Sequence, residues 1–268
     1  MNILDEIIAH KIKEVAEAKA HAPLDVLVRS EYFLRTPVSM SAAIQAKDAT
    51  GIIAEFKRKS PSKGVLNPNA TVAQTTAGYA AAGASALSVL TDSKFFGGSS
   101  EDLIAARRAN KCPIIRKDFV IDEYQIVEAK SIGADAILLI AAVLATSDAI
   151  KLARFAHSLK LEVLLEVHDQ EELARTSEVE ADMIGVNNRN LKSFEVSTDT
   201  SKQLAPLIRD GVVKVSESGI SDPTVIHSLR QFGYEGFLIG ESFMKSSQPE
   251  DAARIFIKSL REYGTAAA

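Results

Sequence analysis

Features that would point to several other classes of protein are missing from this sequence. Cys112 is the only cysteine, which excludes an internal disulfide, and its position just before Pro113 predicts a small buried residue. No apolar run reaches the roughly 18 residues that a membrane-spanning helix needs. The N-terminus lacks the basic start and apolar stretch of a signal peptide. We therefore expect a cytoplasmic protein that does not associate with membranes.

Charge and histidine content argue against two further classes. The chain has 31 basic and 35 acidic residues and a formal net charge of −4, so no nucleic-acid-binding surface is predicted. The five histidines show no spacing typical of metal ligands, which argues against metal-dependent hydrolysis and predicts no metal site.

What the sequence does contain is a regular alternation of short apolar segments and helical patterns. Hydrophobic residues make up 46% of the 268, enough for a sizeable core. Buried strands are predicted at Gly51–Phe56, Ala86–Leu90, Ile114–Arg116, Ala136–Ala141, Glu162–Val167, Met183–Val186, Val212–Val215 and Phe237–Ile239. Helices are predicted at about Thr71–Ala82, Ser100–Asn110, Asp122–Ser131, Ser147–Leu159, Gln170–Ser177, Thr198–Ile208, Pro223–Gln231 and Pro249–Tyr263.

This alternation predicts an α/β fold. Apolar strands that alternate with helices are typical of a parallel sheet covered by helices, and eight such units match a closed (β/α)8 TIM barrel. An open, doubly wound sheet is the alternative. That fold ordinarily has a Gly-x-Gly-x-x-Gly turn after its first strand, and Lys57–Gly64 has none.

The first 50 residues precede the first predicted strand and form an N-terminal helical extension. Apolar residues recur at helical spacing, with acids and lysines opposite, at Ile3, Leu4, Ile7, Ile8, Ile12 and Val15. This predicts an amphipathic helix packed on the barrel, either as a passive cover or as a lid over a pocket. Pro23 and Pro37 lie in a linker that fits a second short helix. We predict one domain over residues 1–268, with 1–50 packed on the barrel.

The segment Ile52–Gly64 carries the first chemical signal, because an apolar strand runs directly into charged residues and a Ser/Pro/Gly loop. Side chains alternate along a strand, so Glu55 and Lys57 point the same way. For a lone Glu-x-Lys pair, an ordinary salt bridge at the end of a strand is the preferred interpretation. The basic residues Arg58 and Lys59 then favour an anionic substrate.

Polar residues follow several other predicted strands, where barrel enzymes build their active sites. They are Lys117 after the third strand, Glu166 and His168 on the fifth, Asn187 and Arg189 on the sixth, Glu217 and Ser218 on the seventh, and Gly240 and Glu241 on the eighth. Lys117 and Glu166 could work as a general acid and a general base on either side of one ligand. For His168 a hydrogen-bonded structural role is the preferred interpretation.

The turns after the seventh and eighth strands predict a phosphate site. Many barrels bind phosphate there through backbone N–H groups and the N-terminus of a short helix. Ser218-Gly219 and Gly240-Glu241 occupy these places. Glu241 is an awkward neighbour for an anion, so either its side chain turns outward or the phosphate interpretation is wrong.

Five segments, in this order, resemble the indole-3-glycerol-phosphate synthase family of tryptophan biosynthesis. They are Glu55–Gly64, Arg116–Phe119, Leu165–His168, Gly185–Leu191 and Ser216–Ile220, and the resemblance extends to the N-terminal segment Ile3–Ile8. It implies a carboxy-lyase that closes the pyrrole ring of 1-(2-carboxyphenylamino)-1-deoxyribulose 5-phosphate. Carbon dioxide and water are lost, and indole-3-glycerol phosphate is formed.

The resemblance also implies roles for individual residues. Lys117 resembles the general acid, Glu166 the acid/base in dehydration, and Glu55 the group that stabilises charge on the anilino nitrogen. The full catalytic set that it implies is Glu55, Lys57, Lys117, Glu166, Asn187 and Glu217. Substrate contacts are implied for Ser60, Phe119, Arg189, Leu191 and Ser218, and phosphate contacts for Gly219, Gly240 and Glu241.

The resemblance further implies no cofactor, no metal and a sugar phosphate substrate. Expected partners are limited to other enzymes of tryptophan biosynthesis, and the expected assembly is a monomer or weak homo-oligomer. The fused phosphoribosylanthranilate isomerase module of some relatives is expected to be absent. Two other functions stay open, a Schiff-base aldolase with a strand-end lysine and a non-catalytic sensor of a phosphorylated ligand.

Overall fold

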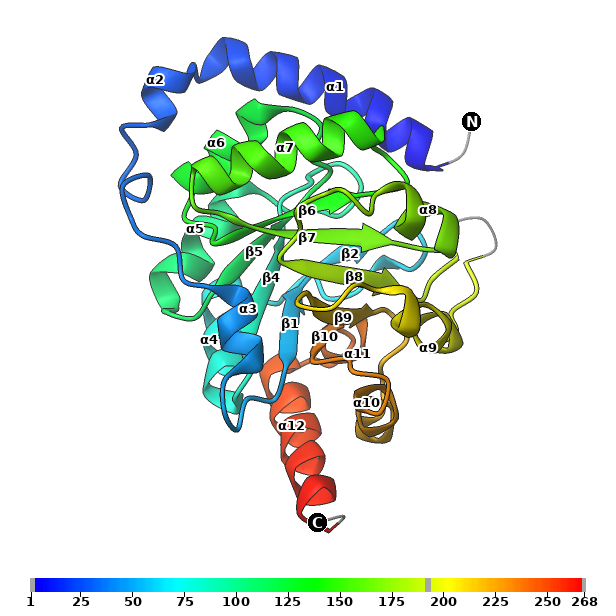
Figure 1. Ribbon diagram of the computed structural model, residues 1–268. Coiled ribbons are helices and arrows are strands. Elements are labelled where there is room, and N and C mark those ends of the chain that lie inside the picture. Colours follow the sequence, from blue (N-terminus) through cyan, green and yellow to red (C-terminus); the bar gives the residue numbers. More distant parts are fainter. Residues whose placement is uncertain (1–2, 191–193, 267–268) are drawn as a thin grey trace.

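The computed structural model describes residues 3–190 and 194–266, and it describes the side chains of these residues as far as Tyr263. Its centre is a closed barrel of parallel strands (Figure 1). Around the barrel the strands are β1 (Ile52–Phe56), β10 (Gly236–Ile239), β9 (Val213–Glu217), β8 (Met183–Asn187), β7 (Glu162–Val167), β6 (Ala136–Ile140), β5 (Ile114–Lys117) and β4 (Ala86–Leu90). The predicted (β/α)8 fold is confirmed.

Helices surround the barrel in the predicted order. They are α4 (Val72–Ala82), α5 (Ser100–Ala109), α6 (Glu123–Ser131), α7 (Thr146–Ser158), α8 (Gln170–Arg175), α9 (Asp199–Leu204), α10 (Pro223–Arg230) and α12 (Pro249–Ala266). Several begin at a side chain that accepts a backbone N–H of the first turn, as Ser99, Asp122, Asp169 and Asp222 do.

Some short elements were not predicted. The loop after β1 contains an antiparallel hairpin of β2 (Lys59–Ser60) and β3 (Gly64–Val65). A short helix, α11 (Glu241–Met244), follows β10. The helix predicted at Thr198–Ile208 is divided into α9 and a 3-10 turn, η1 (Ala205–Leu207). Cys112 was predicted to be buried, but it is only partly buried.

The barrel interior is apolar at the end where the strands begin and polar at the end where they finish. Ile53, Ile115, Leu164, Val215 and Leu238 belong to one buried interior cluster. Because side chains alternate along a strand, the next inward position on each of these strands lies two residues further on. Those positions are Glu55, Lys117, Glu166, Glu217 and Gly240, so the candidate catalytic residues share one layer.

The N-terminal extension consists of α1 (Ile3–His21), α2 (Leu24–Leu27) and α3 (Met40–Gln45). Figure 1 shows α1 and α2 passing outside α6, which both helices contact. The helix is as predicted, and Ile7 and Val15 of its predicted apolar face are buried, but Lys11 is buried as well and Ile12 is not. Lys11 is 0% exposed whereas Ile12 is 58% exposed, because Lys11 finds carboxylate partners inside the protein.

Helix α3 closes the end of the barrel where the strands begin. Its side chains Met40 and Ile44 join the interior cluster. The Glu162 carboxylate, at the start of β7, accepts the backbone N–H groups of Met40 and Ser41 at 2.7 and 2.9 Å. An acidic side chain at a helix N-terminus is favourable. Among the described residues, no helix is long and apolar enough to cross a membrane.

Candidate active site

The centre of the site is the ammonium group of Lys117, at the last position of β5. Its Nζ lies 2.8 Å from Glu166 Oε2 and 3.1 Å from Glu217 Oε2. Both carboxylates are buried, with exposed fractions of 4% and 1%, and the lysine side chain is 13% exposed. The structure therefore brings together three of the predicted catalytic residues from β5, β7 and β9.

This geometry shifts the three pKa values in different directions. Burial alone would lower the pKa of Lys117, but Glu166, Glu217 and Glu55 raise it above its ordinary value. Burial would raise the pKa of Glu166, yet Lys117 and His168 hold it well below its usual range. For Glu217, burial outweighs the attraction of Lys117 and, with repulsion from Glu166, raises the pKa to about 7.

Two glycines leave room for these carboxylates. A Cβ atom on Gly185 would lie 2.2 Å from Glu217 Oε1, and one on Gly240 would lie 2.5 Å from Glu55 Oε1. Both distances are too short for any side chain without rearrangement of the site. Gly240, predicted as a phosphate contact, thus also accommodates Glu55.

Glu55 and Lys57 face the same side, as predicted. Lys57 Nζ lies 2.6 Å from Glu55 Oε1, and Ser88 on β4 donates to Glu55 Oε2 at 3.3 Å. Ser88 was not identified from the sequence, although the inward alternation along β4 would have identified it. Arg58 differs from expectation, because its guanidinium pairs with Asp102 at the start of α5. Its charge is therefore not free for a substrate.

Asn187 and Arg189 follow β8. Asn187 Nδ2 donates to Glu166 Oε1 at 3.2 Å, so the amide belongs to the cluster around Lys117. Arg189 Nη2 lies 3.4 Å from Glu241 Oε2, and Lys245 Nζ lies 2.6 Å from Glu241 Oε1. Burial would raise the pKa of Glu241, but Lys245 and Arg189 keep it below its ordinary value. The negative charge of Glu241, which would repel a phosphate, is thus neutralised by the side chains of Arg189 and Lys245.

The turn after β9 has an unusual backbone. Ser218 and Gly219 have φ values of 69° and 77°, both in the left-handed region, which is uncommon for serine. The Ser218 carbonyl accepts Asn188 Nδ2 at 3.0 Å, which fixes the turn to the end of β8. Gly219 is exposed at this turn, and α11 begins at Glu241, just after the neighbouring strand β10.

The remaining predicted contacts lie at the rim. Phe119 follows β5, and its ring centroid is 6.0 Å from that of Phe96, so the two rings form one apolar wall. Ser60 lies in β2 and is 7% exposed. Leu191 falls outside the described residues.

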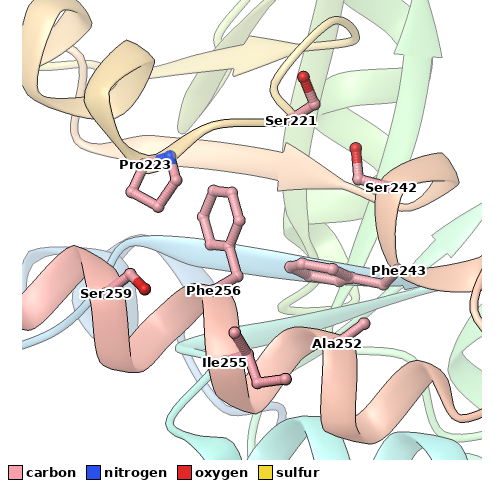
Figure 2. A pocket seen from close by; sticks show the side chains of 8 residues that line it. All are labelled: Ser221, Pro223, Ser242, Phe243, Ala252, Ile255, Phe256 and Ser259. Carbon is pink, nitrogen blue, oxygen red and sulfur yellow. The ribbon is translucent and has the colours of Figure 1, made fainter.

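A pocket of about 360 Å³ lies outside the barrel, beside α10, α11 and α12. Figure 2 shows Ser221 and Ser242 on one side of the Phe243 and Phe256 rings and Ser259 on α12; the lining residues are Ser221, Pro223, Ser242, Phe243, Ala252, Ile255, Phe256 and Ser259. None of the predicted site residues lines it, and it contains no charged side chain. In the described part of the chain, no group of three or more His, Cys, Asp or Glu side chains is placed to hold a metal ion.

Fold and site together define a (β/α)8-barrel enzyme whose acid/base groups gather at the carboxyl ends of the strands. Comparison with known sequences gives the family. Residues 4–256 match the sequence model of indole-3-glycerol phosphate synthase, and the chain belongs to that family.

Individual relatives agree with this membership. The indole-3-glycerol phosphate synthase of Bacteroides thetaiotaomicron is 50% identical over 97% of this chain and 99% of its own length. That of Burkholderia ambifaria is 46% identical over 95% and 99%. Among solved structures, thiamine phosphate pyrophosphorylase from Pyrococcus furiosus has a TM-score of 0.57 at 14% identity, covering 79% of this chain and 95% of its own. At that identity the likeness concerns the fold alone.

Proposed function

We propose that this protein is a carboxy-lyase of tryptophan biosynthesis that converts 1-(2-carboxyphenylamino)-1-deoxyribulose 5-phosphate into indole-3-glycerol phosphate, carbon dioxide and water. The observation that carries the proposal is the Lys117 ammonium held between Glu166 and Glu217 in a chain of this family. A protonated lysine and buried carboxylates are the groups that acid-catalysed ring closure followed by dehydration requires.

Lys117 is proposed as the general acid. Its raised pKa keeps it protonated, so it can donate a proton to the substrate C2 carbonyl oxygen as the aromatic carbon attacks. The same property opposes an aldolase mechanism, because a Schiff-base lysine needs a neutral amine with a lowered pKa.

Glu166 and Glu217 are proposed to handle the protons of the later steps. Glu166 stays ionised and acts as the base in dehydration, with Asn187 fixing its second oxygen. Glu217, with a pKa of about 7, exchanges protons with Lys117 near neutral pH. Glu55, beside Lys57, stabilises positive charge on the anilino nitrogen.

The ends of the substrate are assigned to the rim of the barrel. The anthranilate ring lies against Phe119, and its carboxylate faces Lys57, Ser60 and Arg189, as the resemblance implies. Phosphate binds to the backbone of Ser218, Gly219, Gly240 and Glu241. The cations beside Glu241 support this, since Lys63 also acts on that carboxylate and the local charge is net positive.

Location and assembly are also part of the proposal. We place the protein in the cytoplasm as a monomer or weak homo-oligomer whose only expected protein partners are other tryptophan-pathway enzymes. Light scattering at several protein concentrations measures the oligomeric state. A concentration-independent mass of a large assembly would contradict the proposal.

The direct test is to mix the purified protein with the substrate in the presence of a metal chelator and to follow indole fluorescence. The chain has no tryptophan, so its own emission does not mask the product. Growth of the signal is the expected result. A folded protein that binds the substrate without turnover would instead be a sensor, and trapping by borohydride with a sugar phosphate would reveal an aldolase.

A further inference from the structure

His168 is a buried histidine that lies between two carboxylates, those of Glu166 and Glu172. It directly follows β7, and its side chain is 8% exposed. Nδ1 lies 3.2 Å from Glu172 Oε2 on α8, and Nε2 lies 3.3 Å from Glu166 Oε1. The imidazole therefore connects the first turn of α8 to a residue of the acid/base cluster.

The contact on the α8 side holds the ring in one orientation. Glu172 Oε2 accepts the backbone N–H of His168 at 2.8 Å as well as facing Nδ1. Because the same carboxylate oxygen contacts both the backbone and the ring of His168, the side chain cannot turn without losing that interaction. Burial would lower the pKa of His168, but Glu166 and Glu172 raise it to about 10, so the ring carries both N–H groups at neutral pH.

The contact on the other side is with Glu166 alone. Nε2 of His168 is buried and has no hydrogen-bond partner among the described residues, since its N–H is not aligned on the Glu166 oxygen at 3.3 Å. The other neighbours of Glu166 are Asn187 on the same oxygen and Lys117 on the second one. A buried N–H donor that faces only one carboxylate is suited to hold that carboxylate in place as its other contacts change.

We propose that His168 is a positioning residue for Glu166: anchored through Nδ1 by Glu172, it uses its Nε2 N–H to keep the Glu166 carboxylate in the orientation that the reaction requires when Lys117 turns to the substrate. The inference rests on the proposed function. It assigns His168 no contact with the substrate and no proton transfer. The purely structural alternative, that His168 only fastens α8 to β7, makes a different prediction.

Two substitutions separate these roles, because the amide nitrogen of each lies where one ring nitrogen lies in histidine. His168→Gln keeps a donor near the place of Nε2, and His168→Asn keeps one near Nδ1. The positioning role predicts that His168→Asn lowers kcat by about 100-fold, as expected when a reacting group moves by about an ångström. His168→Gln is expected to retain most of the activity, and KM is expected to stay close to the wild-type value in both variants.

Controls make each outcome decisive. His157→Gln removes a half-exposed histidine that pairs with Asp182 away from the site, and it should leave kcat unchanged. Thermal melting checks that each variant is folded, and activity is expressed per folded molecule. A wild-type protein without turnover would refute the proposed function itself. With active wild type, equal kcat values for His168→Gln and His168→Asn, or an effect on melting alone, would overturn the positioning role.

Discussion

Glu166 and Glu217 show how neighbouring contacts give two chemically identical side chains different properties. Both are buried and both contact Lys117. Glu166 also has His168 and Asn187 beside it, whereas Oε1 of Glu217 has no hydrogen-bond partner among the described residues. Glu166 is therefore held ionised and Glu217, with a pKa of about 7, is about half protonated at pH 7, which is the difference expected of an acid/base pair.

The raised pKa of Glu217 predicts a cost in stability. A carboxyl group whose pKa rises from 4.5 to about 7 on folding binds a proton more tightly in the folded state. Its contribution to the free energy of unfolding is therefore lost as pH rises from about 4.5 to 7. Glu217→Gln should lack this loss. The unfolding free energy of the variant minus that of the wild type should therefore increase by on the order of 3 kcal/mol from pH 4.5 to pH 8.

Urea unfolding of both proteins at the two pH values measures this difference. Subtracting wild type from variant removes the contribution of the other acidic groups. Glu217→Gln should also lose activity, because glutamine stabilises the site but has no ionisable group that can exchange a proton. A difference in unfolding free energy that does not change with pH would show that Glu217 has an ordinary pKa.

At the scale of elements, α1 is attached to the barrel by a buried cation. Lys11 Nζ lies 3.1 Å from Asp92 Oδ2 and 2.8 Å from Asp118 Oδ1, at the ends of β4 and β5. Asp92 also accepts the backbone N–H groups of Phe95 and Phe96. The extension is thus connected to the loop that carries part of the aromatic wall, and it is not a loosely attached cover.

Removal of this cation should destabilise the protein strongly. Lys11→Met leaves buried Asp92 without the cation it faces, whereas Asp118 keeps its pair with Arg116, and an unpaired buried charge typically costs about 3–5 kcal/mol. Lys19 is a matched control on the same helix, because its pair with Asp122 is partly exposed, and Lys19→Met should cost at most about 1 kcal/mol. Addition of Asp92→Asn to Lys11→Met removes the unpaired charge and should recover part of the stability. Equal unfolding free energies for the two lysine variants would contradict this account.

The order of elements was predictable from the sequence because most barrel strands are short segments that are buried on both faces and largely apolar. The extra elements were not predictable in this way. The β2–β3 hairpin and α11 are only a few residues long, so neither shows a hydrophobic period. Lys11 was placed on the polar face of α1, because its burial depends on Asp92 and Asp118, which are distant in sequence.

On the scale of the whole molecule, stability and chemistry occupy opposite ends of the barrel. The end where the strands begin is filled by apolar side chains and closed by α3, whereas the other end collects buried charges. The strand-end rule placed Lys117, Glu166 and Glu217 correctly, because the carboxyl ends of parallel strands meet at one face. It did not predict which contacts each residue makes. The ion pair between Arg58 and Asp102 and the burial of His168 beside Glu166 are visible only in the packed structure.

The measurement that tests the central claim most directly is kcat of Lys117→Met with 1-(2-carboxyphenylamino)-1-deoxyribulose 5-phosphate, next to Lys151→Met, which changes an exposed lysine on α7. If Lys117 is the general acid, its variant remains folded and loses about 10²–10⁴-fold in kcat, while the control keeps wild-type turnover. Turnover of folded Lys117→Met within a few-fold of wild type would contradict the account.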